Sequence, residues 1–232
     1  MGGAVDKLNY NDIRNIFKNS PAERVGPPIK QELWNRSIES SLDFIEQNIS
    51  TAVCFETRSE LHAYALTKLP STGLICEFGV YKGHSVNALA DALGHMGDPR
   101  TIFGFDSFEG LSEDWLGHFA LAGTFDLGGN LPEVREKVQL ISGWIDDSLP
   151  KFLETNAENI ALSHIDMDTY SPCRDILNAL RGRFVPGSII IFDELLAFPG
   201  WQNHEYRALQ ECVDVPYDFI AFSGHHAAIR FT

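Results

Sequence analysis

Short apolar runs separated by amphipathic stretches dominate the chain from Gly73 onward. Five of them, LICEFG, TIFGFD, VQLISG, IALSHIDMD and GSIIIFDE, span residues 74–79, 101–106, 138–143, 160–168 and 187–194. Each is apolar almost throughout, as strands are in parallel sheets that helices cover on both faces. The stretches between them have the length of crossover helices. Two last runs, YDFIAFSG and HHAAIRF, meet at Gly224 and predict an antiparallel hairpin.

The pattern predicts an α/β fold, with a doubly wound, mostly parallel seven-stranded sheet, an antiparallel C-terminal hairpin and an N-terminal helical extension. In this extension, Leu33, Ile38, Leu42 and Ile45 lie near one face of a predicted helix, and residues 56–69 predict another. We divide the chain into a helical extension or lid at 1–70 and a larger domain at 71–232. The sequence SPAERVGPP at 20–28 breaks the helical pattern. We expect the segment before it to form an active-site flap or an arm that joins copies of the chain. The alternative is a frayed tail.

Composition narrows the class of protein. The chain has 232 residues, enough for one substantial domain, and its 18 basic against 32 acidic residues give a net charge of -14. Such a charge repels phosphate backbones and anionic lipids, so we expect neither nucleic acid nor membrane as a partner. The start of the chain lacks the apolar core of a signal peptide, which favours a cytoplasmic protein. The four cysteines are far apart and are expected to be buried thiols.

Acidic residues end the first two apolar runs, where a doubly wound sheet binds its ligand. Glu77 precedes Gly79 and Gly83, two glycines that allow a tight turn into a helix. Asp106 follows Gly83 by 23 residues, near the position of an acid that binds ribose hydroxyls. Glu77 would repel the pyrophosphate of NAD but attract the ammonium and sulfonium groups of S-adenosylmethionine. The alternatives are a nicotinamide-dependent oxidoreductase and a non-catalytic cofactor-binding protein.

Four more acids, Asp166, Asp168, Asp193 and Glu194, end the fourth and fifth runs. Asp166 and Asp193 are separated by 193 − 166 = 27 residues, the length of a crossover unit. The strand ends are therefore expected to bring three or four carboxylates together. Hard oxygen ligands of this kind suit Mg²⁺, or Mn²⁺ or Ca²⁺. The alternative is that these acids only cap helices and turns.

Five motifs, EFGVYKGHS, GFDSFEGL, GWIDDSLP, HIDMDTYSPCRDIL and FVPGSIIIFDE, resemble in order and spacing the class I S-adenosylmethionine-dependent methyltransferases, within them the macrocin O-methyltransferase family. The resemblance covers about residues 56–212. It implies S-adenosylmethionine as cofactor and a hydroxylated small molecule, such as a sugar or another natural product, as acceptor. It assigns the metal to Asp166, Asp193 and Glu194. The residues that it and the glycine turn place at the cofactor are Glu77, Gly79, Tyr81, Gly83, Ser85, Asp106, Ser107, Trp144, Ile145 and Asp146.

The general base is the part of the site on which the motifs say least. Thr169 stands where catechol-type O-methyltransferases have a lysine, so a lysine base is excluded. Asp168, beside Asp166, is the predicted base, and His204 is a second candidate. Trp201 is expected to stack on the acceptor ring. The sequence thus predicts a divalent-metal-dependent O-methyltransferase.

Overall fold

A computed structural model describes residues 14–15, 18, 28–118 and 120–232. The chain divides into two units, Met1–Leu33 and Trp34–Thr232. The predicted break at 20–28 and the segment before it, interpreted above as a flap, an arm or a tail, lie almost entirely outside the described residues. Among the described residues, no helix is long and apolar enough to cross a membrane.

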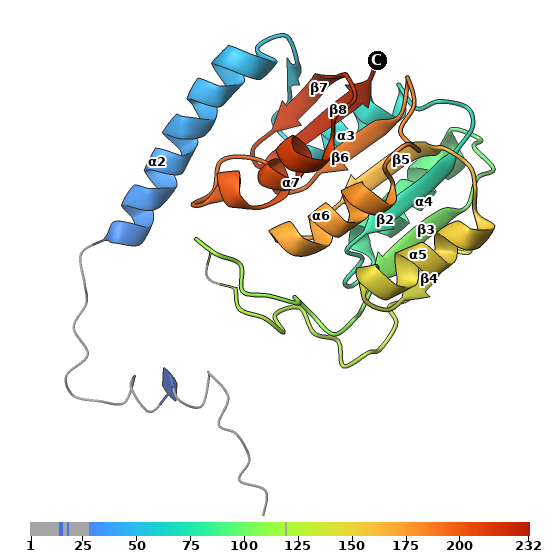
Figure 1. The fold of residues 1–232 in the computed structure, drawn as a ribbon, viewed down its shortest axis with the longest axis horizontal. Helices are drawn as coiled ribbons and strands as arrows, with labels where there is room; N and C mark the ends of the chain where they lie inside the picture. Colours follow the sequence, from blue (N-terminus) through green and yellow to red (C-terminus); the bar gives the residue numbers. More distant parts are fainter. Residues whose placement is uncertain (1–13, 16–17, 19–27, 119) are drawn as a thin grey trace, which may run out of the picture. The chain divides into compact units, whose positions relative to one another are not determined.

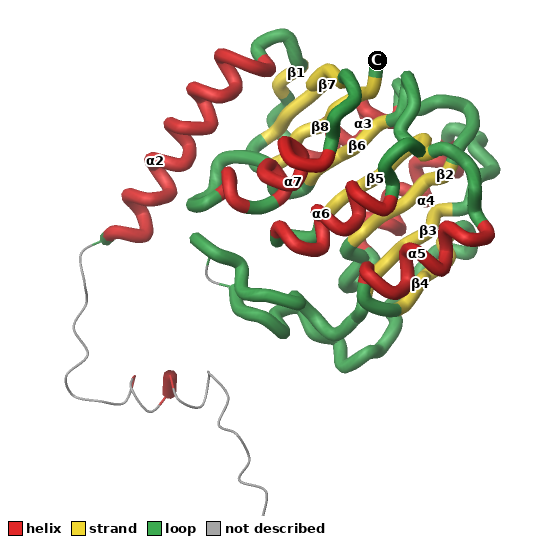
Figure 2. The backbone as a smooth tube through the Cα atoms, viewed as in Figure 1, coloured by secondary structure: helices red, strands yellow, loops and turns green. Residues whose placement is uncertain are grey.

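Trp34–Thr232 is built on one twisted sheet whose strand order is β1-β7-β8-β6-β5-β2-β3-β4 (Figures 1 and 2). The five apolar runs and the hairpin all form strands of this sheet, and only β8 is antiparallel to its neighbours. The fold prediction is confirmed, with one addition, because the short β1 pairs with β7 and makes eight strands. The bounds are β1 Val53–Cys54, β2 Leu74–Phe78, β3 Ile102–Asp106, β4 Val138–Ser142, β5 Ile160–Ile165, β6 Ile189–Phe192, β7 Tyr217–Ser223 and β8 His226–Phe231.

Helices cover both faces of the sheet. On one face α3 and α4 pack through Leu61 and Val86, and on the other α5, α6 and α7 pack through Leu149, Ile176 and Leu209 (Figure 1). Side chains alternate between the two layers along each strand, so that Ile191 belongs to the α3 layer and Phe192 to the α7 layer. The bounds are α2 Ile29–Phe44, α3 Arg58–Leu66, α4 His84–His95, α5 Ile145–Thr155, α6 Tyr170–Ala179 and α7 Glu205–Cys212, with a π-helical turn at Ile45–Ile49 and a 3₁₀ turn at Trp201–Asn203.

Local sequence explains where α3 begins. Thr57 caps the helix by accepting from the backbone N–H of Glu60, and the Glu60 carboxylate bonds back to the Thr57 N–H at 3.0 Å. This capping box satisfies N–H groups that a helix start leaves without partners. The helix predicted at 56–69 is therefore present, two residues shorter at its start and three at its end.

All four cysteines are unpaired, and Cys76, Cys173 and Cys212 are buried as the sequence predicts. Cys54 is exposed in the short edge strand β1, which corrects the prediction for that residue.

Strand order reverses between β2 and β5. From β2 the chain continues to β3 and β4 on one side of the sheet, and from β5 it continues to β6 on the other side. In doubly wound folds the ligand crevice opens at this switch point, outside the carboxyl ends of the strands. The topology therefore places the site between the loops that follow β2, β3, β5 and β6.

Candidate active site

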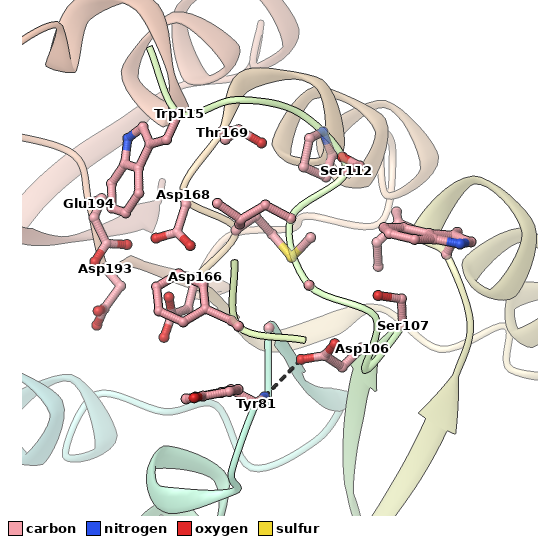
Figure 3. A pocket seen from close by; sticks show the side chains of 18 of the residues that line it. Tyr81, Asp106, Ser107, Ser112, Trp115, Asp166, Asp168, Thr169, Asp193 and Glu194 are labelled. Carbon is pink, nitrogen blue, oxygen red and sulfur yellow. Dashed lines mark hydrogen bonds between the residues drawn. The ribbon is translucent and has the colours of Figure 1, made fainter. Parts of the chain in front are cut away.

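A cavity of about 310 Å³ opens at the switch point (Figure 3). The glycine turn after β2, the long loop after β3, the start of α5 and the acidic strand ends line it. Its walls combine apolar side chains with carboxylates, as small-molecule sites commonly do. The lining residues used below are Gly79, Tyr81, Asp106, Ser107, Leu111, Trp115, Phe125, Trp144, Ile145, Asp166, Met167, Asp168, Asp193 and Glu194.

Gly79 has a conformation that only glycine can adopt at this point. Its φ is +87°, and a Cβ atom there would lie 1.8 Å from the carbonyl oxygen of Asp166. The end of β2 thus lies directly against the backbone that follows β5. Gly83, with φ of +79°, is the N-cap of α4, so both glycines of the predicted turn are required by backbone geometry.

Asp106 binds the glycine turn itself. Its Oδ2 accepts from the backbone N–H groups of Val80 at 2.9 Å and Tyr81 at 2.8 Å, and its Oδ1 accepts from that of Phe108 at 2.7 Å. The bond to Tyr81 is drawn in Figure 3. A carboxylate has about four acceptor positions, so one remains free to face the cavity. Asp106 therefore fixes the loops after β2 and β3, and its predicted contact with a ribose rests on that single position.

Glu77 does not line the cavity, which corrects its predicted direct contact with the cofactor. It is fully buried, and its Oε1 accepts from the Ser85 hydroxyl at 2.8 Å while its Oε2 lies 3.0 Å from Nδ1 of His164. Side-chain alternation turns it toward the α3 layer. Gly83 and Ser85 are also absent from the cavity wall, and Asp146 is exposed.

The remaining predicted cofactor residues do meet at the cavity. Tyr81 extends from the glycine turn and Ser107 from the loop after β3. Trp144 and Ile145 join them at the first turn of α5, where Trp144 is 39% exposed. These side chains come from the loops after three consecutive strands of the chain, β2, β3 and β4. Figure 3 shows Ser107 on the side of the cavity away from Asp193 and Glu194.

Asp166, Asp168 and Glu194 form an acidic cluster in which one carboxylate oxygen of each lies within 4.8 Å of the others. Asp168 reaches it because its φ is +62°, a left-handed turn that cancels the alternation of the strand. Figure 3 shows its carboxylate turned toward that of Glu194. Burial first, and then repulsion between the acids, raises the pKa of Asp168 to about 7 and the pKa values of Asp166 and Glu194 above their usual range.

A divalent cation fits this acidic cluster. Oε2 of Glu194 is buried and has no hydrogen-bond partner among the described residues, so an oxygen donor is available. Three carboxylates that repel one another in a water-poor site are stabilised by a bound cation, and oxygen donors suit Mg²⁺ or Mn²⁺. This cluster shares Asp166 and Glu194 with the predicted triad and contains Asp168 in addition.

Asp193, the third member of the predicted metal triad, also lines the cavity, and its charge is the first of those that raise the pKa values of Asp166 and Asp168. Asp193 continues the alternation of β6 into the α3 layer, and its carboxylate faces Arg58, His164 and His226 at 3.2, 3.5 and 3.2 Å. Burial works against its ionisation, but the two imidazoles hold the pKa of Asp193 below its ordinary value. It therefore lies between the acidic cluster and these basic groups.

His204 and Trp201 are not part of the cavity wall, which corrects two predictions. His204 is buried at the start of α7, where its Nε2 donates to the carbonyl oxygen of Leu116 at 2.7 Å, and burial lowers its pKa. Trp201 packs against Phe44 and Tyr206, and its indole N–H donates to Ser40 at 3.1 Å. Both side chains hold loops together and have no access to an acceptor.

Glu205 is a site residue that sequence reasoning missed. It is fully buried in the first turn of α7, and its two oxygens accept from the backbone N–H groups of Met167 at 3.1 Å and Glu194 at 3.2 Å. Burial raises its pKa to about 8. It ties the two loops that carry the acidic cluster, and the only signal in the sequence was an acid that directly follows His204.

A doubly wound sheet with a glycine turn after β2 and acids on the following strand ends defines a Rossmann-like methyltransferase fold. The comparisons with known proteins agree. Residues 76–195, more than half of the chain, match the family described as "Methyltransferase domain", and the chain belongs to that family. No curated protein matches.

Three solved structures with this fold illustrate the relationship. The calicheamicin methyltransferase CalS11 is 24% identical, with 90% of this chain and 95% of that chain covered and a TM-score of 0.60. A second CalS11 structure, described as the apo form of a TDP-rhamnose 3'-O-methyltransferase, is 26% identical, with 90% and 97% covered and a TM-score of 0.54. The O-methyltransferase NovP is 19% identical, with 74% and 76% covered and a TM-score of 0.54. The prediction of an S-adenosylmethionine-dependent O-methyltransferase is confirmed at the level of the class.

Proposed function

We propose that the protein methylates a hydroxyl group of a small molecule without phosphate, such as a sugar or another natural product. S-adenosylmethionine is the methyl donor, and Asp166, Asp168 and Glu194 hold a divalent cation. The acidic cluster carries this proposal, because it shares one cavity with the glycine turn and the aromatic end of the site.

The two ends of the cavity have different chemistry and suit different ligands. Tyr81, Trp144 and Ile145 offer aromatic and apolar surface to an adenosine group, and Ser107 offers a hydroxyl. Asp106 keeps the glycine turn in place beside them. The acidic cluster at the other end is where an acceptor hydroxyl binds. Holding both substrates in one enclosed site removes much of the entropic barrier to transfer between them.

When bound, the cofactor supplies an activated methyl group and the cation lowers the pKa of the hydroxyl. Asp168 takes the hydroxyl proton. In the metal-free chain, burial and then the charge of Asp193 raise the pKa of Asp168 to about 7. A bound cation would lower this pKa, so Asp168 would serve as the base through its position beside the hydroxyl. One of its oxygens is enough to hold the cation, which leaves the other for the proton. Glu205 keeps the acids in position through the backbone on either side.

The cavity wall also restricts the acceptor. Among the described lining residues there is no lysine, arginine or histidine, whereas five are acidic: Asp106, Asp166, Asp168, Asp193 and Glu194. A diphosphate group would bind beside these carboxylates without a cationic side chain. We therefore propose an acceptor without phosphate, unlike the TDP-rhamnose in the description of CalS11. Leu111, Trp115, Phe125 and Met167 provide apolar surface for the acceptor ring.

The test is a mass-spectrometric assay of S-adenosylhomocysteine and methylated product, with a panel of sugars, glycosides, phenols and nucleotide-linked sugars. We expect O-methylation of uncharged acceptors, loss of turnover in excess chelator, and recovery with Mg²⁺ or Mn²⁺. Calorimetry should show binding of S-adenosylhomocysteine and none of NAD. Chelator-resistant turnover would remove the cation from the mechanism. Preference for nucleotide-linked sugars would contradict the proposed acceptor class.

We further propose that α2 joins copies of the chain. Ser41 near the end of this helix accepts from the backbone N–H of Ala197 at 2.8 Å, so α2 is held to the loop after β6. The neighbouring stripe of the helix carries Ile38 and Leu42, which are 46% and 52% exposed. Apolar side chains presented on a fixed helix favour an oligomer contact over a loose tail.

A further inference from the structure

Thr169 has a buried hydroxyl group for which the fold provides no partner. It is the N-cap residue of α6, it is 1% exposed, and it lines the cavity next to Asp168. Its Oγ1 makes no hydrogen bond within the part of the chain that the structure describes. Buried hydroxyl groups in native structures are nearly always satisfied, because an unpaired one costs free energy. Since Thr169 forms part of the cavity wall, a molecule bound in the cavity can supply the missing partner.

The start of α6 explains why Thr169 is unpaired. An N-cap side chain normally accepts from the backbone N–H of the second or third helical residue. The third residue here is Pro172, which has no N–H, and the N–H of the second, Ser171, donates to the Glu113 carboxylate at 2.9 Å. Glu113 also accepts from the Ser171 hydroxyl at 2.9 Å. A carboxylate of the loop after β3 thus caps α6 in place of Thr169, and the threonine hydroxyl is left for the cavity.

The place of Thr169 in the cavity is that of an acceptor contact. It directly follows Asp168, the proposed base, in the chain. Figure 3 shows it near Trp115, on the side of the cavity away from Tyr81 and Asp106. Tyr81 and Asp106 belong to the glycine turn and its support, where the cofactor is proposed to bind. The molecule that reaches Thr169 is therefore the acceptor.

The chemistry of Thr169 suits a neutral oxygen. A threonine hydroxyl can donate and accept, so it pairs well with another hydroxyl group. An anionic group of the acceptor would instead meet the nearby carboxylates of Asp168 and Glu194. In the proposed function, on which this inference rests, the acidic cluster binds the hydroxyl that is methylated. Thr169 is then available for a second oxygen of the same molecule.

We propose that Thr169 hydrogen-bonds to a second hydroxyl of the acceptor and so determines specificity. The enzyme selects a ring with at least two hydroxyl groups, such as a pyranoside, over a ring with one. A site that pairs a buried polar group with a substrate hydroxyl discriminates against the analogue without it, because the protein group is then left unpaired.

Three variants separate this role from a structural one. Thr169→Val replaces the hydroxyl with a methyl group of similar shape, Thr169→Ser retains the hydroxyl, and Ser163→Ala is the matched control. Ser163 in β5 also has a buried hydroxyl without a partner among the described residues, but it does not line the cavity. We expect the melting temperatures of unliganded Thr169→Val and Ser163→Ala to stay the same or rise, since neither substitution removes a hydrogen bond within the protein.

Kinetics with matched acceptors test the specificity. The probes are methyl rhamnopyranoside, methyl glucopyranoside, their monodeoxy analogues, and cyclohexanol as the ring with one hydroxyl. With the better pyranoside, Thr169→Val should lower kcat/KM about 2–10-fold, mainly through KM, which is the factor expected for one neutral hydrogen bond. One monodeoxy analogue should show the same loss with the unmodified protein and no further loss with Thr169→Val. Thr169→Ser should retain the preference, and Ser163→Ala should match the unmodified protein with every probe.

Two results would overturn the proposal. One is a clear fall in the melting temperature of Thr169→Val relative to Ser163→Ala, which shows that the hydroxyl is bonded inside the protein. The other is an equal effect of Thr169→Val on the pyranosides, all the deoxy analogues and cyclohexanol. If no pyranoside is methylated, the same comparison is made on the melting-temperature shift that each pyranoside causes in the presence of S-adenosylhomocysteine, and the absence of any shift also overturns it. Failure of the proposed function is seen separately, as no S-adenosylhomocysteine formed by the unmodified protein with any acceptor.

Discussion

Asp106→Asn tests how the loops after β2 and β3 are held at the cofactor end of the cavity. The substitution preserves the size of the side chain but replaces one of two acceptor oxygens with a donor. In the native structure all three bonds to Asp106 come from backbone N–H groups, at 2.7–2.9 Å. An asparagine can keep its oxygen toward Val80 and Tyr81, but its NH₂ group then faces the N–H of Phe108.

The cost follows from these three bonds. One buried donor loses its acceptor, which costs about 1–3 kcal/mol, and two charge-assisted bonds become neutral ones, at roughly 1 kcal/mol each. We expect the free energy of unfolding to fall by about 3–5 kcal/mol. A domain with the usual stability of roughly 5–15 kcal/mol remains folded after this loss, so the variant can be studied.

Urea denaturation measures the stability, and calorimetry with S-adenosylhomocysteine measures the effect on the cofactor end. Asp91→Asn is the control, because Asp91 also accepts charge-assisted bonds, here from the Arg135 side chain at 2.9 Å on the exposed surface of α4. An exposed pair contributes about 1 kcal/mol or less. If Asp106→Asn costs no more than the control, the backbone bonds do not hold the loops. If stability is unchanged while S-adenosylhomocysteine binding is lost, Asp106 acts on the ligand alone.

Four further predictions concern the turn, the acids and α2. Gly79→Ala should prevent folding, because its methyl group meets a backbone oxygen, whereas Gly97→Ala, with φ of +71° and open space around it, should give soluble protein with a small loss of melting temperature. Glu194→Gln should lose Mg²⁺-dependent turnover at least about tenfold and still bind S-adenosylhomocysteine in calorimetry; full activity would exclude Glu194 as a ligand. Asp168 has a pKa of about 7 in the folded, metal-free chain, so the folded chain keeps this proton at pH values where the unfolded chain has lost it. The metal-free protein should therefore lose stability as pH rises from about 4 to 7. Added Mg²⁺ should restore the melting temperature above pH 7, and Asp168→Asn should flatten the profile; an unchanged profile would contradict the raised pKa. Leu42→Glu should convert any oligomer to monomer by light scattering, and the proposed role of α2 fails if assembly is unaffected.

Hydrophobic patterning along the chain was enough to predict the sheet. Each apolar run became a strand because a parallel strand covered on both faces has no polar side to show. The position of the cavity followed as well, since parallel strands end at one edge of a sheet and the acids end the strands. Gly79 was identifiable for the same reason: a strand that ends in a tight turn needs a residue without a side chain.

The direction of each side chain at the strand ends was decided by the tertiary structure. Asp193 and Glu194 are neighbours in sequence, but the pleat of β6 sends one to the histidines and the other to the acidic cluster. Asp168 reaches the cluster through a left-handed turn that its sequence does not specify. The same holds for Trp201, an aromatic in a loop near the site that is buried against Phe44.

Long-range convergence was also beyond the sequence. His62 and His164 are 164 − 62 = 102 positions apart, and His164 and His226 are 226 − 164 = 62 positions apart. These residues meet because α3 packs on the sheet where β8 lies beside β6. Glu205 likewise joins two loops that only the packing of α7 brings together. Local periodicity determines which residues form strands and where these end. Contacts between distant segments depend on strand order and helix packing, which no short stretch of this chain encodes.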